Sequence, residues 1–167
     1  DHLTNLPNRT LFMDRAQSAL RQSRRENKLF AIIYIDIDKF KTINDNMGHN
    51  AGDVLLKQIS LRFKHCLRDS DTVSRVGGDE FAILMLNLTS KSDATIVANR
   101  IIKTNSVPIN INSTDISPKT SLGISFYPSD GDNIEELIKN ADKAMYLSKE
   151  NGSNQYLFCK SNLNKKI

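Results

Sequence analysis

The 167-residue sequence contains no apolar run close to the roughly 20 residues that a membrane-spanning helix requires. Its amino terminus also lacks the basic stretch followed by an apolar one that marks a secretion signal. Internal repeats and low-complexity segments are absent as well. We therefore expect a soluble, cytoplasmic domain that makes no membrane contact of its own. Because the first residue is Asp1 rather than Met, we expect the domain to belong to a longer chain, other parts of which can still tether it to a membrane.

Cysteine and histidine are too few and too scattered to build a disulfide framework or a zinc site. The two cysteines, Cys66 and Cys159, lie far apart without CxxC spacing. Cys66 falls on the apolar face of a predicted helix, which indicates a small core residue in a reducing compartment. The three histidines, at positions 2, 49 and 65, give no zinc pattern.

The overall composition is that of one ordinary globular domain, with 39% hydrophobic and 25% charged residues. The net charge of +4 suits an anionic ligand such as a nucleotide, although many domains without one carry the same charge. We expect no nucleic-acid partner. A cluster of basic residues between positions 21 and 28 is interpreted as a solvated helix face.

Hydrophobic residues recur at helical and strand spacing in alternating segments. Helices alternate with strands, and the two strands around Gly77 and Gly78 form an antiparallel hairpin, which favours an α+β sandwich with a mixed, largely antiparallel central sheet flanked by helices. Residues 1–160 are expected to form this domain, and 161–167 to start a linker to a possible downstream domain. The pattern predicts helices at residues 8–26, 53–66, 91–106 and 133–150, strands at 29–37, 73–76, 80–86, 119–127 and 156–159, and a polar loop at 44–52.

The hairpin turn Gly77-Gly78 is the first candidate for chemistry. Glycine permits a positive φ, and we expect both residues to use this freedom in a tight turn. The absence of side chains also lets a bulky ligand approach the backbone. Two acids, Asp79 and Glu80, follow directly. Acids beside a turn are usually only solvated, so this segment alone proves little.

A second carboxylate, Asp36, ends the predicted central strand, where an uncompensated buried charge would be costly. Mg²⁺ held by Asp36 and Asp79 would balance it, because hard oxygen ligands suit this ion. Pairing of Asp36 with Arg75, or capping of a helix, would balance it equally well. The spacing alone does not decide between these interpretations.

A third group of polar residues follows the same strand. Lysines in the segment Lys39-Phe40-Lys41 can neutralise phosphates. Asn44 and Asp53 together offer the donor and acceptors that match the edge of a guanine. Such residues are common in loops, and taken alone they are weak evidence.

Together these segments resemble the GGDEF family of diguanylate cyclases over essentially the whole domain. The resemblance rests on Tyr34-Ile-Asp-Ile-Asp-Lys-Phe-Lys-Thr-Ile-Asn-Asp-Asn-Met-Gly-His-Asn-Ala-Gly-Asp53, Arg75-Val-Gly-Gly-Asp-Glu-Phe81, Asp1-His-Leu-Thr-Asn-Leu-Pro-Asn-Arg9, Ser121-Leu-Gly-Ile-Ser125 and Ala141-Asp-Lys-Ala-Met-Tyr146. It implies a fold like that of nucleotidyl cyclases and polymerase palms. It also implies condensation of two GTP into cyclic di-GMP with release of two pyrophosphates.

The resemblance assigns roles to individual residues. A metal ion, Mg²⁺ or Mn²⁺, would bind Asp36, the carbonyl of Ile37 and Asp79, while Glu80 completes the catalytic acidic cluster. Asp79 would help to deprotonate the attacking hydroxyl, unless the metal-bound state does so without a discrete base. The implied substrate-binding residues are Asn44 and Asp53 for guanine, Leu3, Phe40 and Leu56 around the base, Lys41 and Lys149 for phosphates, and Gly77 and Gly78 beside the substrate.

Each domain would hold one GTP, so the resemblance implies that two copies face each other for catalysis. It also implies a product-inhibition site for cyclic di-GMP at the RxxD segment Arg68 to Asp71, joined by Arg100. RxxD arises often by chance, and a charged helix end is the plain alternative.

One position departs from the family pattern. The family commonly carries a basic phosphate ligand where this chain has Ser153, and its loss would cost about 1.5–3 kcal/mol of triphosphate binding. The tail from Asn154 resembles the connector to a phosphodiesterase domain of the EAL type. The main alternative is therefore a catalytically weak GTP-binding module that regulates such a neighbour. A pure cyclic di-GMP receptor is disfavoured, because a receptor needs no acidic cluster.

Overall fold

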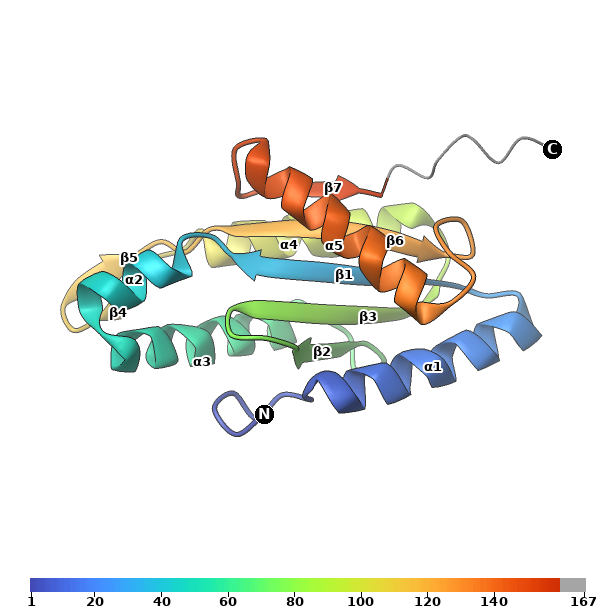
Figure 1. Cartoon of the computed structure of the whole chain (residues 1–167), viewed down its shortest axis with the longest axis horizontal. Helices are drawn as coiled ribbons and strands as arrows, with labels where there is room; N and C mark the ends of the chain where they lie inside the picture. Colours follow the sequence, from blue (N-terminus) through green and yellow to red (C-terminus); the bar gives the residue numbers. More distant parts are fainter. Residues whose placement is uncertain (160–167) are drawn as a thin grey trace.

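The computed structural model describes residues 1–159, which form a central five-stranded sheet packed between helices (Figure 1). The strand order is β2-β3-β1-β6-β7, and every neighbouring pair is antiparallel except the parallel pair of β6 and β7. The prediction of a mixed, largely antiparallel sheet is therefore confirmed. The strands are β1 Leu29–Ile37, β2 Thr72–Arg75, β3 Glu80–Leu88, β6 Thr120–Tyr127 and β7 Tyr156–Phe158.

Five helices accompany the sheet within the described residues. Side chains of α1 and α5 share one hydrophobic cluster with one face of β1, and side chains of α3 and α4 share a second cluster with its other face. In Figure 1 helix α5 crosses in front of β1 and β6, and α4 lies behind them. The helices are α1 Arg9–Glu26, α2 Phe40–Met47, α3 His49–His65, α4 Lys91–Asn105 and α5 Ile134–Glu150, and a separate hairpin is formed by β4 Ile109–Ile111 and β5 Thr114–Ile116.

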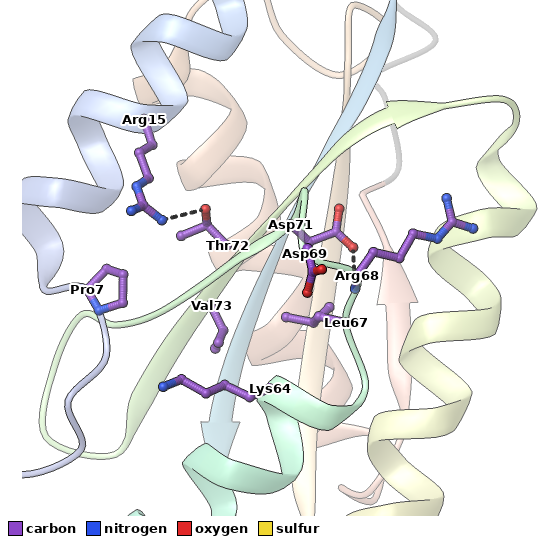
Figure 2. Close-up of a pocket in the computed structure, with 9 residues that line it drawn as sticks. All are labelled: Pro7, Arg15, Lys64, Leu67, Arg68, Asp69, Asp71, Thr72 and Val73. Carbon is purple, nitrogen blue, oxygen red and sulfur yellow. Dashed lines mark hydrogen bonds between the residues drawn. The ribbon is translucent and has the colours of Figure 1, made fainter.

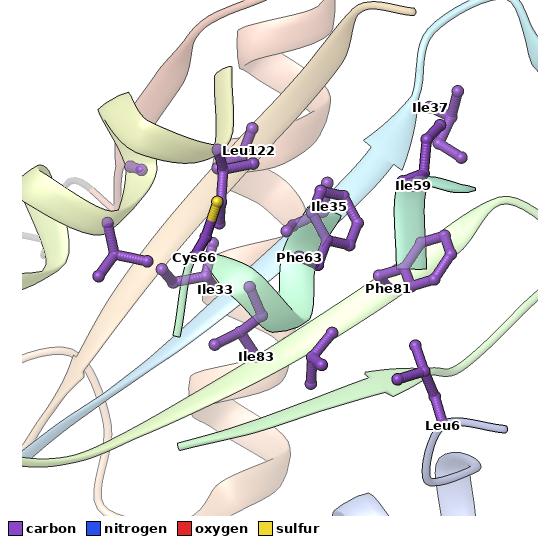
Figure 3. Close-up of a cluster of buried hydrophobic side chains, with 14 of the residues drawn as sticks. Leu6, Ile33, Ile35, Ile37, Ile59, Phe63, Cys66, Phe81, Ile83 and Leu122 are labelled. Atoms are coloured by element: carbon purple, nitrogen blue, oxygen red, sulfur yellow. The ribbon is translucent and has the colours of Figure 1, made fainter. Parts of the chain in front are cut away.

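Strand β1 is the centre of both clusters, which explains its nearly continuous apolar sequence. Because side chains alternate along a strand, Ile33 and Ile35 lie on the same face and share a cluster with Phe63 and Cys66 of the α3 segment (Figure 3). The rings of Phe63 and Phe81 pack edge to face with centroids 5.1 Å apart. Cys66 is buried in the same cluster, as its place on an apolar helix face predicted.

The predicted loop at 44–52 is wrong, because this segment is helical on both sides of Gly48. Gly48 ends α2 and precedes the first residue of α3 with a φ of 83°, a conformation that favours glycine. Helix α2 has no fully buried residue, so its sequence has the polar composition of a loop. The hairpin of β4 and β5 was not predicted either, since each strand has only three residues.

Helix α5 approaches strand β6 closely at Gly123. A Cβ atom at this position would overlap the backbone of α5 at Ala141 and Met145. Only glycine permits this approach, which carries the last turn of α5 over the end of β1 where Lys149 meets Asp36.

None of the helices within residues 1–159 combines the length and hydropathy needed to cross a bilayer. The linker predicted for residues 161–167 lies outside the described part of the chain.

Candidate active site

The acidic residues predicted for the metal site meet at one corner of the sheet, where β1 ends beside the turn between β2 and β3. Asp36 lies opposite Glu80 in the register of β1 and β3. The next residue of β1, Ile37, donates its N–H to the carbonyl oxygen of Asp79 at 3.3 Å. The structure therefore brings Asp36, Ile37, Asp79 and Glu80 together from segments more than 40 residues apart in the sequence.

The turn itself is built differently from the prediction. Neither Gly77 nor Gly78 has a positive φ; in residues 1–159 only Gly48 and Gly152 among the glycines do. Glycine is required at 77 for space, because a Cβ atom there would lie 2.6 Å from Oε2 of Glu80. A Cβ atom on Gly78 would meet nothing within 4 Å, so the tip of the turn is open. Gly77 therefore makes room for the side chain of Glu80, and Gly78 leaves the tip of the turn accessible to a ligand.

Arg75 holds this turn in place and does not pair with Asp36. Its Nε and Nη2 donate to the carbonyl oxygen of Gly78 at 3.0 and 2.8 Å, and its Nη1 lies 3.2 Å from a carboxylate oxygen of Asp1. Burial lowers the pKa of Arg75, while the charges of Asp53 and Asp79 act in the opposite direction. The guanidinium of Arg75 is thus close enough to interact electrostatically with Asp53, predicted to read guanine, and with Asp79, predicted to bind the metal.

The partner of Asp36 is Lys149, in the last turn of α5. Lys149 Nζ lies 2.7 Å from Asp36 Oδ1, and the side chains are 42% and 12% exposed. Burial raises the pKa of Asp36, the bond from Lys149 lowers it, and the charges of Asp79 and Asp38 raise it further, with a net rise. Burial alone would lower the pKa of Lys149, but its acidic neighbours, with Asp36 foremost, raise it.

Glu80 also lies among like charges. Burial raises its pKa first, and the charges of Asp142, Asp36 and Asp79 add to the effect. The charge of Arg9 acts in the opposite direction. Even with Lys149, Arg75 and Arg9 nearby, the carboxylates Asp36, Asp38, Asp79, Glu80 and Asp142 outnumber the cations, and this excess of negative charge favours a further cation.

The donor set suits a hard divalent ion that keeps part of its coordination shell for other ligands. Asp36 and Asp79 supply carboxylate oxygens, and the backbone of Ile37 supplies a carbonyl oxygen. Within residues 1–159 no three His, Cys, Asp or Glu side chains are grouped so as to hold a metal ion by themselves. A ligand phosphate and water would have to complete the shell, which is how Mg²⁺ is usually bound.

The sequence analysis assigned no role to Asp38, which links the end of β1 to β6 and to the turn after α5. Asp38 is 6% exposed; its Oδ1 accepts from Ser121 Oγ at 2.8 Å and its Oδ2 accepts from the backbone N–H of Asn154 at 3.2 Å. Gly152, Ser153 and Asn154 all have positive φ, so this carboxylate anchors an unusual turn directly after α5. Its spacing of two from Asp36, on the same face of a strand, is the signal that could have identified it.

The residues predicted to read guanine come from two neighbouring helices. Asn44 lies in α2 and Asp53 in the first turns of α3, on either side of the break at Gly48. The Oδ1 atom of Asn44 is buried without a hydrogen-bond partner. Of the residues predicted around the base, Leu3 and Phe40 are half-buried, whereas Leu56 is 2% exposed within the core; of the predicted phosphate ligands, Lys41 is exposed and Lys149 is engaged with Asp36.

The RxxD segment borders a cavity of about 270 Å³ between α1, α3 and β2 (Figure 2). Both carboxylate oxygens of Asp71 accept backbone N–H groups, from Arg68 and Leu86 at 3.3 Å each. The exposed side chain of Arg68 extends toward α4. Arg100 of that helix donates to the carbonyl oxygen of Cys66 at 3.2 Å, which brings it near the start of the segment.

Two further cations line this cavity, Arg15 and Lys64, and the sequence analysis did not identify them. Arg15 Nη1 donates to Thr72 Oγ1 at 3.0 Å (Figure 2). Lys64 lies four residues before Arg68 in the sequence, whereas no spacing links Arg15 in helix α1 to this segment, so only the fold reveals Arg15.

A second cavity, of about 510 Å³, lies between α2, the segment after β5 and the turn after α5. Ser153, the position that departs from the family pattern, lines it together with Lys39 and Lys119. Ser153 contributes no charge, and its hydroxyl donates to the carbonyl oxygen of Lys149 at 3.4 Å.

Comparison with known proteins identifies the same family by its sequence profile and by individual relatives. The profile of the family described as diguanylate cyclase, GGDEF domain, matches residues 1–155. The chain is 41% identical over 164 residues to the bifunctional diguanylate cyclase/cyclic di-GMP phosphodiesterase MucR of Pseudomonas aeruginosa, covering 98% of this chain and 24% of MucR. It is 43% identical over 150 residues to the diguanylate cyclase TpbB of the same organism, covering 89% of this chain and 34% of TpbB. The chain therefore spans about a quarter to a third of these relatives.

Solved structures share the fold. The structure of TpbB comprising only its GGDEF domain superposes with a TM-score of 0.94 at 40% identity, covering 97% of this chain and 95% of that one. The GGDEF domain of DgcB from Caulobacter crescentus, solved in complex with c-di-GMP, superposes with a TM-score of 0.83 at 26% identity, covering 96% and 93% of the two chains.

Proposed function

The chain belongs to the diguanylate cyclase GGDEF-domain family, and we propose that it condenses two molecules of GTP into cyclic di-GMP and two pyrophosphates. The observation that carries this proposal is the acidic corner of the sheet, where the buried Asp36 lies opposite Glu80 and Ile37 bonds the backbone of Asp79. An excess of negative charge where β1 ends and β3 begins, with Asp36 buried and Asp79 and Glu80 half-buried, is suited to a metal-bound triphosphate.

In this proposal Asp36, Asp79 and the carbonyl of Ile37 hold Mg²⁺ or Mn²⁺. Such an ion, when bound, neutralises charge on the phosphates and favours deprotonation of the attacking hydroxyl. The protein fixes the backbone of these donors through the β1–β3 register and through the bond from Ile37 N to Asp79 O, so the two segments are already side by side when substrate binds.

The bond changes follow from the substrate. The 3′-oxygen of one GTP attacks the α-phosphorus of the other, and the bond from that phosphorus to the β-phosphate oxygen breaks, so pyrophosphate leaves. Asp79 receives the hydroxyl proton, with Glu80 beside it in the cluster. The same step, repeated in the opposite sense, closes the ring. Each step transfers one guanylyl group and releases one pyrophosphate, and positioning with charge neutralisation accounts for most of the catalysis of such displacements at phosphorus.

Lys149 is suited to bind the phosphates once Asp36 has another partner. Its side chain is 42% exposed and flexible, so it can exchange the carboxylate for a phosphate oxygen at little conformational cost. Lys41, exposed in the first turn of α2, is a second phosphate ligand in this proposal. Ser153 supplies no charge, and the expected consequence is weaker binding of GTP.

Asn44 and Asp53 select guanine, with Leu3, Phe40 and Leu56 around the base and Gly77 and Gly78 leaving room for the nucleotide. The buried acceptor of Asn44 without a partner supports this role, because such atoms are rarely left unpaired unless a ligand satisfies them.

One domain holds one GTP, so ring closure requires a second copy facing the first. We expect a monomer to bind GTP and to turn it over poorly. Cyclic di-GMP is proposed to inhibit through Arg68, Asp71 and Arg100. The closeness of Arg100 to this segment supports that assignment, as does the likeness to the DgcB domain solved with c-di-GMP.

The alternative is a GTP-binding module that regulates a neighbouring domain of the EAL type. A relative named only as a cyclic di-GMP phosphodiesterase, NbdA of Pseudomonas aeruginosa, favours it, as does the uncharged residue at position 153. The two functions separate in one experiment. The domain, fused to a dimeric coiled coil, is incubated with GTP and Mg²⁺, and both cyclic di-GMP and bound GTP are measured. Formation of cyclic di-GMP supports the cyclase; saturable GTP binding without product in the forced dimer supports the regulator.

A further inference from the structure

Gly52 lies in the first turns of α3, at the place where α2 folds back against it. A Cβ atom on residue 52 would overlap Oδ1 of Asn44 and would lie 3.0 Å from Cγ of Asn44 and 3.1 Å from Cζ of Phe40. The carboxamide of Asn44 therefore fills the space that any side chain at position 52 would need.

The backbone does not require glycine at this position. Gly52 has no positive φ, unlike Gly48 four residues earlier. Inside a helix glycine is less stable than alanine, because it loses more conformational freedom on folding. What distinguishes position 52 is the close approach of Asn44.

The carboxamide held there also carries an acceptor that the protein leaves without a partner. Oδ1 of Asn44 is buried and has no hydrogen-bond partner in the protein. A buried acceptor without a partner costs free energy, which a donor on a bound base would recover. The Asn44 side chain is thus ordered by packing against Gly52 before any ligand arrives.

We propose that Gly52 is a positioning residue for guanine recognition: its missing side chain lets the carboxamide of Asn44 pack against α3 in the orientation that reads the base. This inference rests on the proposed function of Asn44. The overlapping atom belongs to the far end of a side chain, so the cheapest response to Gly52→Ala is rotation of the Asn44 carboxamide. The fold survives that rotation, and the arrangement that reads guanine does not.

The test measures binding of GDP and ADP, which cannot be condensed, together with thermal stability. In the wild type GDP binds more tightly than ADP. Gly52→Ala weakens GDP by about tenfold or more, as expected for a lost hydrogen-bonding group, and leaves ADP unchanged. Val54→Ala, at an exposed position two residues along the same helix, changes neither. Retention of the GDP preference by Gly52→Ala, when Asn44→Ala loses it, would overturn the inference.

A second comparison, in a double variant, tests the inference by thermal stability as well as by binding. In the Asn44→Ala background the overlapping carboxamide is gone and only the side-chain atom Cζ of Phe40, 3.1 Å away, has to shift slightly, so adding Gly52→Ala raises the melting temperature, as helix propensity predicts. It also causes no further loss of GDP affinity. A melting temperature that falls in both backgrounds would show that position 52 matters for another reason. If the wild type itself does not distinguish GDP from ADP, the proposed function fails, and this stability comparison still tests the contact.

Discussion

Lys149 and Asp36 form an ion pair across the end of the central strand, with Nζ 2.7 Å from Oδ1. The residues are 113 positions apart in the sequence and meet because α5 packs directly on the backbone of β6 at Gly123. The lysine provides the positive charge that a buried carboxylate requires. It therefore stands where the proposed metal ion would otherwise neutralise Asp36, and the two cations compete for the same oxygen.

This competition gives the first prediction. Lys149→Met removes the resident cation, so Mn²⁺ binds the nucleotide-free domain about three- to tenfold more tightly, a gain of about 0.7–1.4 kcal/mol. Titration followed by electron paramagnetic resonance of free Mn²⁺ measures this directly. Lys143→Met, at an exposed position of the same helix, serves as the control and leaves the affinity unchanged. Equal or weaker binding by Lys149→Met would show that the ion pair and the metal do not share Asp36.

The two glycines of the turn are predicted to respond differently to the same substitution. Gly77→Ala places a methyl group 2.6 Å from Oε2 of Glu80 and displaces that carboxylate, whereas Gly78→Ala enters open space. Displacing a group that supports the metal ligands lowers Mn²⁺ affinity by about tenfold or more. We expect this loss for Gly77→Ala alone, with similar melting temperatures for both variants. Equal affinities in the two variants would contradict the packing of Glu80 against Gly77.

Gly123→Ala is predicted to be strongly destabilising. The new methyl group overlaps backbone atoms of α5, which cannot rotate away, so we expect a loss of about 3 kcal/mol. For a domain of this size the melting temperature falls by about 6–12 °C. Gly131→Ala is the control, because its nearest atoms belong to side chains 3.1 to 3.2 Å away. A Gly123→Ala variant as stable as the control would mean that α5 lies farther from the sheet.

The central strand and the longer helices could be predicted from the sequence because their hydrophobic residues repeat over many positions. The break between α2 and α3 could not, since α2 is short and polar and its end depends on the left-handed conformation of Gly48. The motifs also predicted which residues belong to the acidic corner. They did not reveal that Lys149 pairs with Asp36, or that Asp38 anchors the turn after α5. Both contacts arise from the order of strands in the sheet, which local sequence does not encode.

Product inhibition provides a further prediction. Arg68→Ala removes a guanidinium that is exposed beside the cavity at the RxxD segment, and the inhibition constant for cyclic di-GMP rises by about tenfold or more. The rate measured before product accumulates stays near that of the wild type, because this segment is separate from the acidic corner. Initial rates at increasing concentrations of added cyclic di-GMP provide the measurement. An unchanged inhibition constant would refute the assignment of this site.

The central claim is that the corner formed by Asp36, Asp79 and Glu80 catalyses condensation of GTP. The most direct measurement is the initial rate of cyclic di-GMP formation by the forced dimer, in Mg²⁺, for the wild type, Asp79→Asn and the exposed control Asp14→Asn. The account predicts product from the wild type and the control, and a rate at least about a hundredfold lower for Asp79→Asn, because a lost metal ligand removes several kcal/mol of transition-state stabilisation. Undiminished turnover by Asp79→Asn, or no cyclic di-GMP from a wild-type dimer that binds GTP, would contradict it.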